Sequence, residues 1–112
     1  MATGRLGDVD MPRLLLSPFQ CRSTDAGLVL SGEVDLATAP LLEDALQELA
    51  ANTSGDVRLE CAPLSFIDSS GLRVLVGLHH QLAGRRIVLT NLPEHLRRVF
   101  EIAGLHALFD LE

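Results

Sequence analysis

The residues best suited to chemistry form one short polar stretch, Asp68-Ser69-Ser70-Gly71, which stands between two apolar segments. A serine hydroxyl can serve as a nucleophile when a general base lies within hydrogen-bond reach. Serine and aspartate side chains can also accept from the free amide hydrogens at the start of a helix. Three such residues stand side by side where one suffices, so at least one hydroxyl is left free. We therefore take this stretch as the candidate site.

The flanking elements predict how this stretch is positioned. Before it, apolar residues at 57, 59 and 61 alternate with Arg58 and Glu60, which is the period of a strand with one buried face. After it, the apolar stripe of a helix recurs at Leu72, Leu75, Val76, His79 and Leu82. A helix is therefore expected to begin near Ser69 or Ser70 and to end near 83. Gly71 is expected to let another backbone come close.

The same reading along the chain predicts an α/β domain. Residues 1–12 lack periodicity and are expected to be a flexible leader. Strands are expected at 13–22, 28–34, 56–62 and 86–91, with a short edge strand at 108–111. Helices are expected at 38–51, with Thr38 as N-cap, at 70–83 with Gly84 in the left-handed region, and from Pro93 to Gly104 with Leu96, Val99, Phe100 and Ala103 inward. This order predicts a mixed sheet of four to five strands with helices packed mainly on one face.

Composition excludes several classes of function. A chain of 112 residues with 47% hydrophobic and 21% charged residues fits one soluble domain. The net charge of −6 argues against nucleic-acid binding, and no run is long enough to insert into a membrane, so a cytoplasmic location is expected. Cys21 and Cys61 could form a disulfide, but Cys61 is expected inside the fold as a free thiol in a reducing compartment.

Catalytic and metal-binding alternatives have weaker support. The nearest histidines, His79 and His80, lie ten positions along the same helix, about 15 Å away, which is too far to activate Ser69 or Ser70. Only His95 or His106 could serve as a base, if the fold brought one near. Adjacent histidines diverge by about 100° on a helix and do not share a metal. No glycine-rich nucleotide loop follows a strand. We therefore expect no cofactor, no metal and no enzymatic activity.

One run resembles the signature of a known family. Phe66-Ile67-Asp68-Ser69-Ser70-Gly71-Leu72 is similar to the signature of the STAS family, the domain of bacterial anti-sigma factor antagonists. The similarity extends to Ser31-Gly32-Glu33-Val34-Asp35 and covers the chain from about Leu14 to Leu111. The resemblance implies the same α/β fold, with residues 13–112 as a single STAS domain. It also implies that Ser69, the serine after the aspartate, is phosphorylated by a partner kinase.

The resemblance assigns roles to neighbouring residues as well. It matches Asp35 to the aspartate beside the phosphorylation site, although this residue could instead cap the helix that follows. Asp68 could cap its helix, orient the Ser69 hydroxyl, or do both. Ser70, Gly71, Leu72 and Arg73 belong to the expected partner-binding surface. Better-known members of the family often have glycine at the position of Arg73.

The function implied by the resemblance is a partner switch. The unmodified protein is expected to bind an anti-sigma factor that is also a serine kinase, and phosphorylation of Ser69 ends that binding. A serine phosphatase is expected to reset the switch, and the protein is expected to be a monomer or a weak dimer. The alternative within the same fold is a non-switching STAS subunit of a stress-signalling scaffold or of a lipid-transport complex.

Overall fold

The structure is a computed structural model, and it describes residues 19–112. Predictions for residues 1–18 lie outside the described residues: the leader at 1–12, the domain boundary at 13 and the first part of the strand at 13–22. Within the described part, the chain forms these elements: β1 (Phe19–Thr24), β2 (Gly27–Val34), α2 (Ala39–Ala51), β3 (Val57–Glu60), β4 (Leu64–Ile67), α3 (Ser69–Gln81), β5 (Ile87–Thr90), α4 (Glu94–Ile102), a 3-10 turn (Leu105–Ala107) and β6 (Asp110–Leu111).

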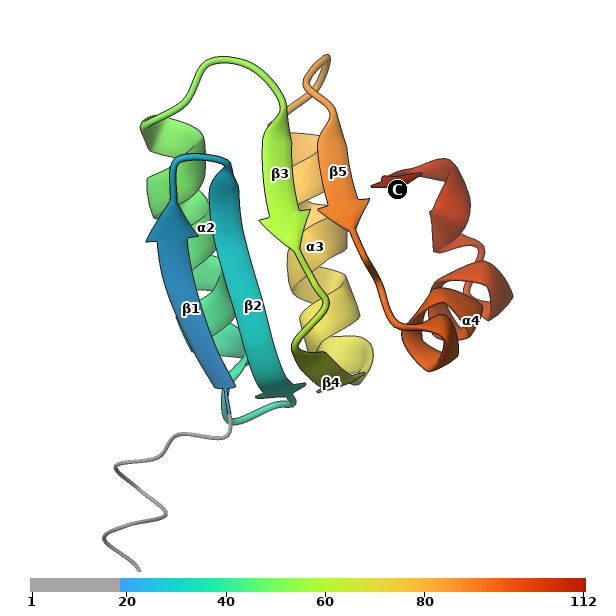
Figure 1. Cartoon of the computed structure of the whole chain (residues 1–112). Coiled ribbons are helices and arrows are strands. Elements are labelled where there is room, and N and C mark those ends of the chain that lie inside the picture. Colours follow the sequence, from blue (N-terminus) through green and yellow to red (C-terminus); the bar gives the residue numbers. More distant parts are fainter. Residues whose placement is uncertain (1–18) are drawn as a thin grey trace, which may run out of the picture.

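The predicted mixed α/β sheet is confirmed. β1 and β2 form the expected antiparallel hairpin, and the remaining strands pair in parallel in the order β1-β2-β3-β5-β6, with β4 also paired to β2. Figure 1 shows α2 and α3 together on one face of this sheet, while α4 lies to one side, after the carboxyl end of β5. The helices within residues 19–112 therefore pack mainly on one face of the central strands.

The number of strands differs from the prediction, because the sheet has six. The strand expected at 56–62 ends at Glu60, and the chain then turns and resumes pairing with β2 as β4. Pro63 was expected to stop the pairing, and that expectation is wrong, since the Gly32 amide donates to the Pro63 carbonyl at 3.1 Å. Proline lacks an amide hydrogen but keeps its acceptor, so it is tolerated between two strand segments.

The helix ends depart from the prediction by small amounts. Thr38 is the N-cap residue of α2, but its side chain makes no cap hydrogen bond and its hydroxyl donates instead to the Glu33 carbonyl at 3.0 Å. α3 ends at Gln81, and Gly84 follows with the expected positive φ of 88°. Ala103 was predicted to face inward and is exposed, because α4 ends one residue earlier, at Ile102.

The core lies between the sheet and the pair α2 and α3. Leu42 and Leu46 of α2 and Leu75 and Leu78 of α3 are buried against the inward residues of the central strands. Leu75 is inside, as predicted, and so is Cys61, which is a free thiol like Cys21. The apolar stripe of α3 thus faces the core and fixes how the start of that helix lies on the sheet.

Candidate functional site

Two parallel strands end side by side beneath the polar stretch. Val34, the last residue of β2, pairs with Ile67, the last residue of β4. The Asp68 amide extends this pairing by donating to the Val34 carbonyl at 3.1 Å. Asp35 and Asp68 are the next residues after the two strand ends, so the fold brings the G-E-x-D and D-S-S-G segments to one edge of the sheet.

Asp68 caps α3. One of its carboxylate oxygens, Oδ1, accepts from the Ser70 amide at 2.8 Å and from the Gly71 amide at 3.4 Å, and its backbone is extended, as is typical of an N-cap. Among the three candidate caps, this assigns the role to the aspartate, and Ser70 lies inside the first turn. No hydrogen bond within residues 19–112 joins the Asp68 carboxylate to the Ser69 hydroxyl, so the orienting role is not seen.

Ser69 is the first residue of α3 and is exposed. Its hydroxyl has no hydrogen-bond partner in the part of the chain that the structure describes. Because Asp68 already satisfies two of the free amides at this helix start, the Ser69 side chain is not needed for capping. The hydroxyl is therefore presented to solvent at the edge of the sheet.

Asp35 is engaged in its own loop. Its Oδ1 accepts from the amides of Ala37 at 3.0 Å and Thr38 at 3.1 Å, and the Thr38 hydroxyl oxygen lies 3.2 Å from the same atom. These contacts agree with the alternative considered from the sequence, in which Asp35 holds the loop that leads into the following helix, α2. In doing so, Asp35 fixes the loop between β2 and α2 next to the start of α3.

Gly71 allows close packing beneath the site. A Cβ atom at this buried position would come within 2.6 Å of Ile67 Cγ1 and 2.7 Å of Val34 Cγ1. The atoms nearest to this position belong to side chains. The expectation that Gly71 lets another backbone come close is therefore corrected. Leu72 is half-buried against the core, whereas Arg73 is exposed. Within the described residues, Arg73 makes no hydrogen bond or ion pair.

Large apolar side chains lie exposed around the polar edge, and sequence reasoning missed them. Leu36, in the loop fixed by Asp35, is 78% exposed, Leu41 of α2 is 50% exposed and Phe66 of β4 is 46% exposed. Phe66 pairs in register with Glu33 of β2, immediately before the two strand ends. A large apolar residue inside a polar loop, as at Leu36, was the available signal in the sequence. These residues give the edge an apolar component.

Other chemistry has little support in the described chain. The His95 ring nitrogen Nε2 is 2.8 Å from the Ser65 carbonyl, so this histidine is engaged with the backbone of β4. His79 is half-buried with its ring 6.0 Å from that of Phe109, and His80 is exposed. Across residues 19–112, no group of three or more histidine, cysteine, aspartate or glutamate side chains is arranged to hold a metal ion. No helix in the same range has the length and apolar character needed to cross a membrane.

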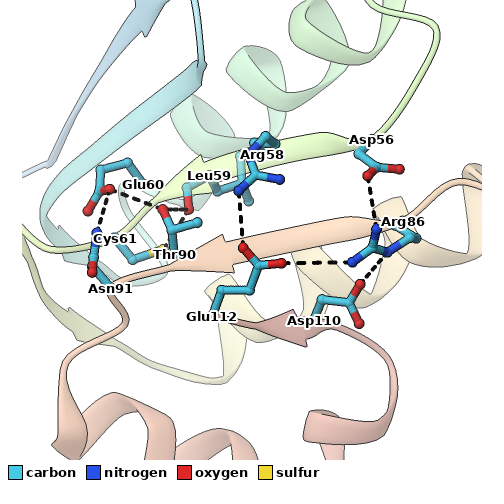
Figure 2. A network of polar contacts seen from close by, with 10 residues as sticks. All are labelled: Asp56, Arg58, Leu59, Glu60, Cys61, Arg86, Thr90, Asn91, Asp110 and Glu112. Carbon is cyan, nitrogen blue, oxygen red and sulfur yellow. Dashed lines mark hydrogen bonds and ion pairs between the residues drawn. The ribbon is translucent and has the colours of Figure 1, made fainter.

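A second polar cluster lies across β3, β5 and β6, and Figure 2 shows it. Arg86 bonds to Asp110 and lies 3.2 Å from Asp56, and Arg58 lies 3.1 Å from Glu112. The hydrogen bond and charge of Asp110, followed by the charge of Asp56, raise the pKa of Arg86. We call these five residues the paired network, because each charged group in it has a partner.

Comparisons with known proteins agree with this geometry. The family model described as "Mlab, STAS domain" matches residues 19–110. The chain is 36% identical over 89 residues to the anti-sigma-B factor antagonist of Bacillus subtilis, covering 78% of this chain and 81% of that protein. It is 34% identical over 94 residues to the protein of the same name from Listeria monocytogenes, covering 81% and 82% of the two chains.

Solved structures give the same grouping. The crystal structure of an anti-sigma factor antagonist from Mycobacterium paratuberculosis superimposes with a TM-score of 0.69 at 26% identity, covering 83% of this chain and 82% of that one. Unphosphorylated SpoIIAA, an anti-sigma factor antagonist, superimposes with a TM-score of 0.65 at 23% identity over 84% of this chain and 87% of that one. Because the identity to SpoIIAA is only 23%, this second comparison supports the fold alone.

Proposed function

Because the chain belongs to the STAS family of anti-sigma factor antagonists, we propose that it is an antagonist switched off by phosphorylation of Ser69. The observation that carries this proposal is the exposed Ser69 hydroxyl at the first residue of α3, which is free of the capping role that Asp68 performs. The relatives are named as anti-sigma-B factor antagonists, and in this proposal the chain receives a phosphate from a partner.

The proposed cycle has two states. Unmodified protein binds an anti-sigma factor that is also a serine kinase, and the sigma factor is released. The kinase brings ATP and transfers its γ-phosphoryl group to Ser69 Oγ. The new oxygen–phosphorus bond replaces the bond to ADP, and the serine proton passes to a base on the kinase. A serine phosphatase returns Ser69 to the unmodified state.

The charge added by phosphate accounts for the loss of binding. Phosphoserine carries about −1.5 to −2 charges at neutral pH. At this edge the added charge joins two carboxylates, Asp35 and Asp68, which are already present. Like charges brought together in an interface cost several kcal/mol, and each 1.4 kcal/mol is about tenfold in affinity. Repulsion at the partner surface is therefore enough for a switch without unfolding the domain.

Variants at the two serines test the assignment. The kinase is first identified by a pull-down with and without ATP, and each variant is then incubated with that kinase and ATP and followed by intact mass. Ser69→Ala should take up no phosphate yet still bind the partner, whereas Ser70→Ala should be modified normally. Ser69→Glu should bind more weakly, although only in part, because glutamate has one charge. Full modification of Ser69→Ala, with the label at Ser70, would overturn the assignment.

The alternative proposal is a non-switching STAS subunit of a signalling scaffold or lipid-transport complex. Its support is the family model that matches residues 19–110, because its description names a STAS domain and no kinase or sigma factor. The proteins that copurify distinguish the two proposals. A small ATP-binding kinase supports the switch, and membrane transport subunits support the alternative.

A further inference from the structure

Arg73 lies one helical turn after Ser69, and both side chains are exposed on α3. Residues at positions i and i+4 of a helix have Cβ atoms about 5–6 Å apart. Side chains on a helix also lean toward its N-terminus and cover the preceding turn. An arginine at position 73 can therefore reach back over the turn that begins with Ser69.

The first-turn amides are poorly placed to receive a phosphate on Ser69. The amides of Ser70 and Gly71 already donate to the Asp68 carboxylate, so a phosphate would have to displace this cap to reach them. The neighbouring acidic groups, Asp35 and Asp68, repel a phosphate. A side-chain cation is needed to offset this repulsion, and Arg73 has no hydrogen bond or ion pair in the described chain.

One acidic group faces Arg73 from the neighbouring helix. Glu43 of α2 and Arg73 line the same groove between α2 and α3, but they form no ion pair within 4.0 Å. A phosphate is a stronger competitor than this carboxylate, because it has nearly twice the charge and three oxygens that a planar guanidinium can contact in pairs. Arg73 is thus free to turn from the groove toward Ser69.

We propose that Arg73 is the intramolecular counter-ion of a phosphate on Ser69. This inference rests on the proposed function, and it adds a second effect to the switch. In the unmodified protein, Arg73 is an exposed cation available to an acidic group of the partner. After phosphorylation it is paired within its own helix, so the partner meets a new anion and also loses a cation.

The test uses protein in which phosphoserine is incorporated at position 69 during translation, so that no kinase is needed. The second pKa of the phosphate, ordinarily about 6, is measured by phosphorus NMR at low ionic strength. Removing the counter-ion in Arg73→Gln should raise this pKa by about 0.2–0.4 relative to the unsubstituted phosphoprotein. Arg73→Lys should fall between the two, because lysine keeps the charge but cannot make a paired contact.

Arg22→Gln is the matched control, because it removes the same charge from an exposed arginine of β1. Arg22 pairs with Val29, five residues before the end of β2 at Val34, which puts it about 17 Å along the strand from the site. This control should leave the phosphate pKa unchanged. An equal pKa in Arg73→Gln and the unsubstituted phosphoprotein, or an equal rise in Arg22→Gln, would overturn the inference. A kinase that never modifies Ser69 would instead count against the proposed function.

Discussion

The two polar clusters of this protein use charge in opposite ways. In the paired network, Arg58 and Arg86 reach across the strands to Asp56, Asp110 and Glu112, and no charged group is left over. At the end of β2 and β4, the carboxylates bond only to nearby backbone and hydroxyl groups, while Ser69 and Arg73 remain unpaired within residues 19–112. Three exposed apolar side chains, Leu36, Leu41 and Phe66, belong to the elements and the loop at these strand ends.

This difference indicates that the paired network stabilises the fold, whereas the ends of β2 and β4, which we call the site edge, are available for binding. The paired network joins β6 to β3 and β5, so its groups are used within the fold, as Figure 2 shows. The site edge holds its backbone with two aspartates and keeps a hydroxyl, a guanidinium and apolar groups available. Groups without internal partners are those that a second protein can bind without first breaking contacts of the fold.

The largest expected effect on stability comes from the core beneath the site edge. Leu75 is 2% exposed, and Leu75→Ala should lower the free energy of unfolding by about 2–5 kcal/mol through lost burial and a cavity. Urea denaturation at constant slope measures the change. Leu36→Ala, at a 78% exposed position of the same edge, is the control and should leave stability within about 0.5 kcal/mol. An equal loss of unfolding free energy in both variants would contradict the assignment of Leu75 to the core and Leu36 to the surface.

The next effect comes from Gly71. Gly71→Ala places a methyl group against Val34 and Ile67, and overpacking of this kind costs about 1–3 kcal/mol. Gly77→Ala is the matched control in the same helix, because a Cβ there meets nothing within 4 Å and alanine favours the helix by about 1 kcal/mol. Thermal unfolding of the pair should therefore give shifts of opposite sign. If Gly71→Ala is instead more stable than the unsubstituted protein, Val34 and Ile67 can shift at little cost in free energy.

The cap assignment predicts a smaller effect and sharpens the comparison at the site edge. Asp68→Ala removes the acceptor of two amides and should cost about 0.5–2 kcal/mol. Ser70→Ala should change stability by less than about 0.5 kcal/mol, because its hydroxyl has no capping role in the described chain. Chemical denaturation of both variants distinguishes the two residues. A larger loss at Ser70 would return the capping role to the serine.

The paired network should respond to salt. Arg86→Ala removes contacts to Asp110 and Asp56 and should lower the unfolding midpoint slightly at low ionic strength. The difference from the unsubstituted protein should shrink in 1 M salt, where charges are screened over about 3 Å. Ser69→Ala removes no charge and should show no such salt dependence. A deficit in Arg86→Ala that persists in high salt would point to packing by the arginine stem.

A pH dependence is expected from Glu60, next to the paired network. The Ala62 amide donates to its carboxylate, and this contact, followed by that of the Asn91 side chain, lowers the pKa of Glu60. A lowered folded-state pKa stabilises the fold above the ordinary pKa of the carboxyl, and the contribution is lost as the pH falls through the folded value. Stability of the unsubstituted protein and of Glu60→Gln, measured from pH 7 to pH 3, should therefore converge at the acidic end. Parallel curves would contradict this reading.

Much of this protein follows from its sequence alone. The period of 2 before 63 and the helical period after 70 specify a strand, a junction and a helix, and the polar residues at the junction identify the candidate site. The burial of Leu75 and of Cys61 also follows from these periods, because side chains on one face of a strand or helix share one environment. That Ser69 is the residue modified stays a prediction.

Tertiary structure decided what depends on contacts between distant residues or on local backbone geometry. The sequence offered Asp68, Ser69 and Ser70 as caps, and only the extended backbone of Asp68 placed its carboxylate over the next amides. Proline at position 63 predicts the end of sheet pairing, but β2 supplies a donor to its carbonyl from thirty-one residues away. The exposure of Leu36 and the lack of a partner for Arg73 within residues 19–112 likewise depend on which neighbours folding brings near, and local periodicity carries no information about those neighbours.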